Sequence, residues 1–158
     1  MKKLTALLLC LLLGLSALAG CQKESKNPGC EEIFKKIEEA IGEDALPPMD
    51  DIDDETLSVL YGIDPADVLE DYRGALAQLN VHGDEILVLK VKAGTMAEAE
   101  AGIGQRRDDL EATWSRYLPE VYEMVQNARV VKNGSYLLFV VSEKPEKAAA
   151  AFDEMTKA

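Results

Sequence analysis

The chain has 158 residues, with 29 acidic and 17 basic side chains and a formal net charge of −12 at pH 7. This length suits one domain with a buried core. The negative charge excludes a nucleic-acid-binding surface, because phosphates require a basic face, and it argues against attachment to anionic lipid through a basic patch.

The N-terminal segment has the order of a bacterial lipoprotein signal. Lys2 and Lys3 precede an apolar run from Leu4 to Leu18, and small residues follow that run. The tetrad Leu18-Ala19-Gly20-Cys21 matches a lipobox, in which the cysteine thiol takes a diacylglyceryl group and the chain is cut between Gly20 and Cys21. We therefore expect acylated Cys21, carrying palmitate-like chains, to become the first residue of the mature protein.

Two other interpretations of this segment are an uncleaved membrane anchor and an ordinary secretory signal. Residues 4–20 approach the minimum length of a spanning helix, roughly 17 residues, so length alone does not separate the alternatives. The small residues near the end of the segment favour a peptidase site over a bilayer centre. Cys10 follows three leucines and has no small residue before it, so Cys21 is the expected lipidation site.

We therefore divide the chain into a signal peptide (1–20), a lipidated cysteine with a flexible tether (21–29) and one folded domain (30–158). Gln22 to Gly29 contains no apolar residue and would span about 26 Å when extended, at about 3.3 Å per residue. Without Lys2 and Lys3, 15 basic residues remain against 29 acidic ones, a formal charge of −14. The expected location is the cell membrane, lipid-anchored on its extracytoplasmic face.

Cys30 is the thiol that remains after signal cleavage and acylation. It has no partner for an internal disulfide. Intermolecular pairing, thiol reactivity and a spectator role beside the tether are the alternatives, and we favour the spectator. Structural zinc needs four ligands and His82 is the sole histidine, so the sequence predicts no zinc site.

The first half of the domain begins with helical spacing over residues 31–41 and then an acidic run over residues 50–55. The expected inner face of the helix is Ile33, Phe34, Ile37, Ala40 and Ile41. The acidic run fails the EF-hand pattern, because Thr56 and Gly62 occupy the positions of the required glycine and glutamate. We expect the acids to cap a short helix whose inner residues are Leu57, Leu60 and Tyr61.

The segment from Val68 to Leu79 is ambiguous. Asp64 and Pro65 are typical of a capped helix start, and the apolar spacing that follows is helical. However, the strand-like run from Glu85 to Lys92 follows turn residues 80–84, which favours an antiparallel strand just upstream.

The second half is predicted as a long helix, a short helix, a hairpin and a closing helix. Thr95 and Glu98 suggest a capping box for the long helix, which Pro119 ends. Its expected inner stripe is Met96, Ala99, Ile103, Leu110, Trp114 and Leu118. Residues 128–142 form the predicted hairpin around a type I′ turn at Asn133-Gly134. Its second strand is apolar without alternation, which indicates a central position. The closing helix starts near Pro145, with Ala148, Ala151, Phe152 and Met155 inward.

Four segments together resemble a known family, domain of unknown function 4358, over roughly residues 30–155. They are Tyr61-Gly62-Ile63-Asp64, residues 80–92, the helix over residues 107–119 ending Trp-Ser-Arg-Tyr-Leu-Pro, and residues 127–142. The resemblance implies a small lipoprotein of Gram-positive bacteria, and it implies that Val68 to Leu79 is extended. It supplies no activity.

We therefore predict an α+β domain in the order α-ββ-α-ββ-α, with an antiparallel sheet of about four strands packed with helices. No catalytic motif is recognisable in the sequence. His82 is the only histidine and is expected in a turn, without a nucleophile in sequence reach. Gly102-Ile103-Gly104 is expected within a helix and is therefore not a phosphate-binding loop. Asp108-Asp109 does not indicate a catalytic pair of acids, because a chain with 29 acidic residues contains such neighbours by chance. The cluster Trp114, Tyr117, Leu118, Val121 and Tyr122 is expected to be core.

We interpret the protein as a non-enzymatic binding or adaptor module without cofactor or metal. Its partners would be membrane lipid through Cys21 and an envelope protein or small ligand, and not nucleic acid. The alternative is a cell-envelope hydrolase that uses carboxylates at an unrecognised site, and its catalytic residues are unknown. A spacer or envelope-stress component without a ligand is a third hypothesis that the sequence does not separate from the first.

Overall fold

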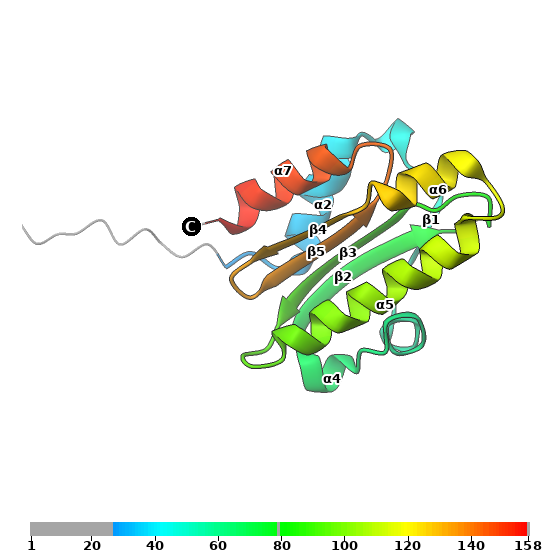
Figure 1. Ribbon diagram of the computed structural model, residues 1–158. Coiled ribbons are helices and arrows are strands. Elements are labelled where there is room, and N and C mark those ends of the chain that lie inside the picture. Colours follow the sequence, from blue (N-terminus) through cyan, green and yellow to red (C-terminus); the bar gives the residue numbers. More distant parts are fainter. Residues whose placement is uncertain (1–26, 79, 158) are drawn as a thin grey trace, which may run out of the picture.

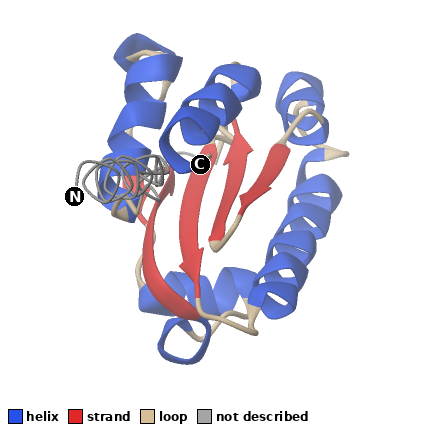
Figure 2. Ribbon diagram, turned by 90° about the vertical axis from the view of Figure 1, so that its left-hand side faces the viewer, coloured by secondary structure: helices blue, strands red, loops and turns tan. Residues whose placement is uncertain are grey.

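The computed structural model describes residues 27–78 and 80–157, so the predicted signal, Cys21 and most of the tether lie outside the described residues. The domain is α+β, as predicted, with helices on both sides of a five-stranded antiparallel sheet (Figures 1 and 2). The elements in chain order are α2 (Cys30–Ile41), η1 (Glu43–Ala45), β1 (Met49–Asp51), α3 (Asp54–Thr56), η2 (Leu57–Tyr61), α4 (Pro65–Val68), β2 (Leu69–Ala77), β3 (Glu85–Val91), α5 (Met96–Trp114), α6 (Pro119–Gln126), β4 (Arg129–Asn133), β5 (Tyr136–Val141) and α7 (Pro145–Thr156).

The sheet order is β1-β2-β3-β5-β4, with two hairpins joined through β3 and β5. The fifth strand is β1, which pairs with β2 at Asp50 and Leu76. The sequence did not predict β1, because three residues with two exposed aspartates carry no strand signal. Charged residues on such a short edge strand also protect it from pairing with other chains.

The ambiguous segment is a strand, as the family resemblance implied. Asp64 caps α4 by accepting a hydrogen bond from the Ala66 N–H, 2.9 Å away, and Pro65 occupies the first turn. The helix ends after four residues, and Leu69 then pairs with Val91 of β3. Pairing with the apolar strand β3 outweighs the helical spacing of residues 69–79, because it gives hydrogen-bond partners to the backbone N–H and C=O groups of a buried strand.

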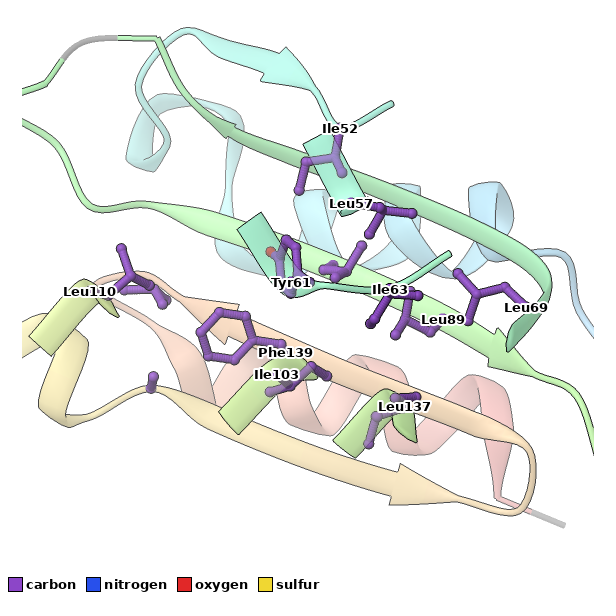
Figure 3. Packing of buried hydrophobic residues seen from close by; sticks show 14 of the residues in the cluster. Ile52, Leu57, Tyr61, Ile63, Leu69, Leu89, Ile103, Leu110, Leu137 and Phe139 are labelled. Atoms are coloured by element: carbon purple, nitrogen blue, oxygen red, sulfur yellow. The ribbon is translucent and has the colours of Figure 1, made fainter. Parts of the chain in front are cut away.

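The sheet is buried on both faces, and each face has its own apolar cluster. On one face, Leu137 and Phe139 of β5 belong to the same apolar cluster as Ile103 and Leu110 of α5 (Figure 3). On the other, Leu138 and Val140 pack in a cluster with α2 and α7, whose buried residues include Phe34, Ile37 and Phe152. This double burial explains why β5 is continuously apolar, and it confirms the predicted central position.

Two local predictions, the capping box at Thr95 and the hairpin turn, were wrong. Thr95 forms no capping box: its hydroxyl donates to the carbonyl oxygens of Val68 and Lys92, at 2.9 and 3.1 Å. The hairpin loop is Gly134-Ser135, because Asn133 pairs with Tyr136. Gly134 has a φ of +59° and no described non-glycine residue has a positive φ, which fits a type II′ turn and excludes type I′.

Some residues expected in the core are less buried than predicted: Tyr117 is exposed, and Ala40, Leu60, Met96, Leu118 and Met155 are half-buried. Tyr117 is 59 % exposed, because its ring stacks obliquely on Trp114 from the solvent side, with ring centroids 5.9 Å apart. Ala40 is half-buried and packs against the apolar cluster that α2 and α7 form on the second face of the sheet, which we call the α2 cluster. Among the residues that the structure describes, no helix is long and apolar enough to cross a membrane.

Candidate functional site

A buried ion pair joins the start of β3 to α5. Glu85 has a side-chain exposure of 2 % and faces Arg106, whose Nη2 donates to Oε2 at 2.6 Å. Arg106 Nε donates to Oε1 at 3.0 Å, and the Tyr61 hydroxyl donates to the same oxygen. Both carboxylate oxygens of Glu85 therefore have partners within the domain.

The packing of α5 on η2 brings these three side chains together. Gly102 allows this approach, because a Cβ there would lie 2.6 Å from the Tyr61 carbonyl oxygen and 2.7 Å from Ile63 Cγ1. Burial and the Glu85 charge raise the pKa of Tyr61 well above its usual range, so this phenol stays protonated and donates its hydrogen bond. Glu85, Arg106 and Tyr61 thus hydrogen-bond to one another and hold β3, α5 and η2 together.

A larger concavity, which we call the acidic pocket, has a volume of about 510 Å³ and lies among η1, residues 81–84, α6 and the β5–α7 loop. Its acids are Asp44, Asp84, Glu120 and Glu143, and none of the described residues that line it is a lysine or an arginine. Its apolar lining includes Leu46, Pro47, Val81, Val121 and Met124. The pocket therefore combines negative charge with an apolar wall.

Asp84 is the buried acid of this pocket. The residue is 5 % exposed, and the His82 Nδ1 lies 3.8 Å from its Oδ2. Burial raises the pKa of Asp84, and the His82 ring and the Asp84 backbone N–H offset part of that rise. Among the described residues, these two groups are the favourable partners of its charge. Asp84 is thus a nearly buried carboxylate with little internal compensation.

Gly83 holds α6 against the start of β3. A Cβ on Gly83 would lie 2.6 Å from Val121 Cγ1, so any larger residue would push α6 outward. Met124 Cε and Trp114 Nε1 lie 3.5 Å from the same position. The glycine therefore allows the close approach of α6, whose Val121 and Met124 form part of the apolar wall of the acidic pocket.

The structure places the residues singled out in the sequence in different surroundings. His82 lies in the exposed turn, as predicted, but beside Asp84. Asp108 and Asp109 are exposed on α5, and Gly102 and Gly104 lie within α5, as expected. Trp114 is buried and Leu118, Val121 and Tyr122 are partly buried, so that cluster is core except for Tyr117. Cys21 and the predicted cleavage site lie outside the described residues.

The acidic run at residues 50–55 is used structurally. Asp53 caps α3 by accepting hydrogen bonds from the N–H and hydroxyl of Thr56, at 2.8 and 2.7 Å. Asp54 accepts from the Tyr72 hydroxyl, and Asp51 pairs with Arg73. Within the described part of the chain, no three His, Cys, Asp or Glu side chains are grouped to hold a metal ion.

The thiol of Cys30 lies inside the α2 cluster and is fully buried. Burial raises the pKa of Cys30, and the nearby Asp71 carboxylate adds to the effect. Asp71 Oδ2 also accepts a hydrogen bond from the Cys30 N–H, at 2.8 Å. Cys30 is a core residue at the start of α2.

Sequence reasoning missed Asp84 because its local pattern is that of a turn. Asn80-Val81-His82-Gly83-Asp84 contains no apolar periodicity that would indicate burial. The residues of α6 that line the acidic pocket together with Asp84 are 35 or more positions away along the chain. The only local signal was a glycine directly before the acid, and a glycine in a turn has a more common explanation.

The model of one protein family, described as Domain of unknown function (DUF4358), matches residues 43–142. This span contains all five strands together with α5 and α6, while α2 and α7 lie outside it and cover the second face of the sheet. No curated protein and no solved structure matches the chain.

Proposed function

The chain belongs to the family described as Domain of unknown function (DUF4358), and we propose that it is a lipid-anchored extracytoplasmic lipoprotein whose domain is a binding module without enzymatic activity. The observation that carries the proposal is the position of the acidic pocket relative to the point where the chain reaches the domain. The lipobox at Leu18-Ala19-Gly20-Cys21 supplies the anchor.

The first described residues are bound to the sheet at one end. The Tyr136 hydroxyl lies 2.7 Å from the Pro28 carbonyl oxygen and 3.1 Å from Asn27 Oδ1. Six residue steps then separate Cys21 from Asn27, a maximum reach of about 20 Å at about 3.3 Å per residue. This tether is shorter than the full segment from Gln22 to Gly29, so the anchored end of the domain stays close to the lipid headgroups.

The acidic pocket lies at the other end of the same strands. Tyr136 pairs with Lys90, whereas Val141 pairs with Glu85, the residue after Asp84. The two ends are therefore separated by about 17 Å along β3, at about 3.3 Å per residue. In Figure 1 the β4–β5 hairpin lies on the left and α6 on the right. A domain held by Cys21 would present the acidic pocket away from the membrane.

The charge of the domain supports the same orientation. Anionic lipid headgroups repel acidic surfaces, and the repulsion decays over a Debye length of about 8–10 Å. Asp44, Glu120 and Glu143 would therefore be disfavoured at the membrane surface. An outward-facing acidic pocket is accessible to molecules of the cell envelope.

Binding is favoured over carboxylate catalysis at this site. A hydrolase of that type needs two acids free to transfer protons or attack a substrate. Glu85, the buried acid next to Asp84, has both oxygens occupied by Arg106 and Tyr61. The remaining acids of the acidic pocket, such as Glu120 and Glu143, are exposed.

The anchor is tested by metabolic labelling with an alkyne fatty acid in a bacterial host that acylates lipoproteins. We expect label on the wild type and on Cys30→Ser, and none on Cys21→Ser. The Cys30→Ser variant is the matched control, because it removes a thiol outside the lipobox. Equal labelling of Cys21→Ser would overturn the proposal.

A further inference from the structure

We propose that the acidic pocket binds an organic cation, an alkylammonium group carried on a hydrocarbon chain, with Asp84 as its counter-ion. This inference rests on the proposed binding function and names the chemistry of the ligand for the same site. Two sources present this same group: a free aliphatic amine and the side chain of a lysine in a peptide.

The first argument is the burial of Asp84 with only partial compensation of its charge. A buried carboxylate is costly unless a cation or several hydrogen-bond donors replace the water that it has lost. Here the His82 ring at 3.8 Å is half-exposed, and the backbone N–H of Asp84 is the other favourable group. An ammonium group in the pocket would supply the missing charge and three donors.

The second argument is the composition of the lining. Four acids surround the pocket, and no lysine or arginine among its described residues competes for them. Lys144, the residue that follows Glu143, donates to the Ile41 carbonyl oxygen at 2.9 Å. The negative potential of the pocket is therefore available to a ligand.

The third argument separates an organic cation from a metal ion. Calcium and magnesium take several oxygen ligands at about 2.0–2.6 Å in one shell. The described residues contain no group of three acids or histidines suited to that geometry. Val121 and Met124 instead provide an apolar wall that suits the methylene groups of an alkylamine. The volume of about 510 Å³ also lies within the range of small-ligand sites, roughly 300–1,000 Å³.

The test is calorimetric titration of the full-length lipoprotein, purified from membranes in a non-ionic detergent, with 1,5-diaminopentane, a trilysine peptide and Mg²⁺. We compare wild type, Asp84→Asn and Asp67→Asn. Asp67 is an exposed acid on α4, so Asp67→Asn is the control that removes the same charge outside the pocket. Substitution of Asp84 removes a costly buried charge, so we expect the variant to fold.

We expect saturable binding of at least one amine probe, weakened ten-fold or more by Asp84→Asn and less than two-fold by Asp67→Asn. Tighter binding of the diamine would indicate a free amine as the source, and tighter binding of trilysine would indicate a lysine side chain of a peptide. Equal weakening by both variants, binding of Mg²⁺ alone, or no saturable binding would overturn the inference. If fatty-acid labelling of Cys21 persists in that case, the anchor stands and only the ligand assignment fails.

Discussion

Arg106 and Glu85 form a two-nitrogen ion pair inside the domain, with Nη2 2.6 Å from Oε2 and Nε 3.0 Å from Oε1. The pair joins α5 to the first residue of β3, where the chain leaves the turn that carries His82 and Asp84. It therefore ties α5 to the sheet directly beside Asp84. Because the pair is buried, its disruption is expected to have a large effect on stability.

Arg106→Met should lower the free energy of unfolding by about 3–5 kcal/mol, because it leaves the Glu85 charge buried without a partner. The double variant Glu85→Gln/Arg106→Met should recover most of that loss, since the amide oxygen still accepts from Tyr61. Urea unfolding followed by circular dichroism measures both. Lys35→Met, which breaks an exposed pair with Glu31, should cost less than about 1 kcal/mol. Similar losses for Arg106→Met and Lys35→Met would contradict the structural role of the buried pair.

Two glycines on α5 should respond to alanine with opposite signs. At Gly102 a Cβ would clash with the Tyr61 carbonyl oxygen and Ile63, and Gly102→Ala should destabilise the domain by about 1–3 kcal/mol. At Gly104 a Cβ would meet nothing within 4 Å, so Gly104→Ala should stabilise it by about 0.5–1 kcal/mol through helix propensity. Thermal unfolding of the two variants gives the comparison. Stabilisation by Gly102→Ala would show that α5 does not lie this close to η2.

Asp84 should make the free energy of unfolding decrease as pH rises above about 4. Its folded-state pKa lies above the ordinary value of 3.8, so just above that pH the folded chain holds a proton that the unfolded chain has lost. The contribution of Asp84 to the free energy of unfolding therefore falls as pH rises through this window. Asp84→Asn removes the contribution, and its stability relative to wild type should rise from about pH 4 toward neutrality.

Asp53 provides the opposite control for that experiment. Hydrogen bonds from Thr56 lower the pKa of Asp53, so its ionised form stabilises the fold above its ordinary pKa and that contribution is lost as pH falls. Asp53→Asn should therefore become less stable relative to wild type as pH rises. Parallel slopes for Asp84→Asn and Asp53→Asn in urea unfolding would refute the burial of Asp84.

The thiol of Cys30 should resist alkylation in the folded protein. It is fully buried, and a raised pKa keeps it protonated, whereas the thiolate is the reactive form. In the Cys10→Ser/Cys21→Ser variant, Cys30 is the remaining cysteine. Maleimide labelling should be at least 100-fold slower in buffer than in 6 M guanidinium chloride. Rapid stoichiometric labelling in buffer would contradict the buried position.

The sequence predicted the elements whose patterns are local and missed those that arise from tertiary packing. The apolar run of β5 indicated a central strand, and Asp64-Pro65 indicated a helix start, because each signal lies within a few residues. The strand β1 depends on pairing with β2, and the loop Gly134-Ser135 depends on the register between Asn133 and Tyr136. A one-residue difference in register is not visible in hydrophobic alternation when both faces are buried.

The candidate site was harder to predict from the sequence than the fold was. Asp84 occurs in a polar turn next to Gly83, against which Val121 and Met124 of α6 pack. Buried acids are recognised from the groups around them, and here those groups come from α6 and the β5–α7 loop. Cys21 is the opposite case, because its predicted lipidation rests on the contiguous motif Leu18-Ala19-Gly20-Cys21 alone.

The measurement that tests the account most directly is energy transfer from two positions on the domain to acceptor lipids in vesicles that contain the acylated protein. Val81→Cys puts a donor dye beside the acidic pocket, and Ser135→Cys puts it at the β4–β5 hairpin; both sites are exposed. The account predicts stronger transfer from position 135 than from position 81, and loss of both signals when Cys21 is replaced by serine. Equal or stronger transfer from position 81 would contradict an outward-facing acidic pocket, and transfer that persists in Cys21→Ser would contradict the anchor.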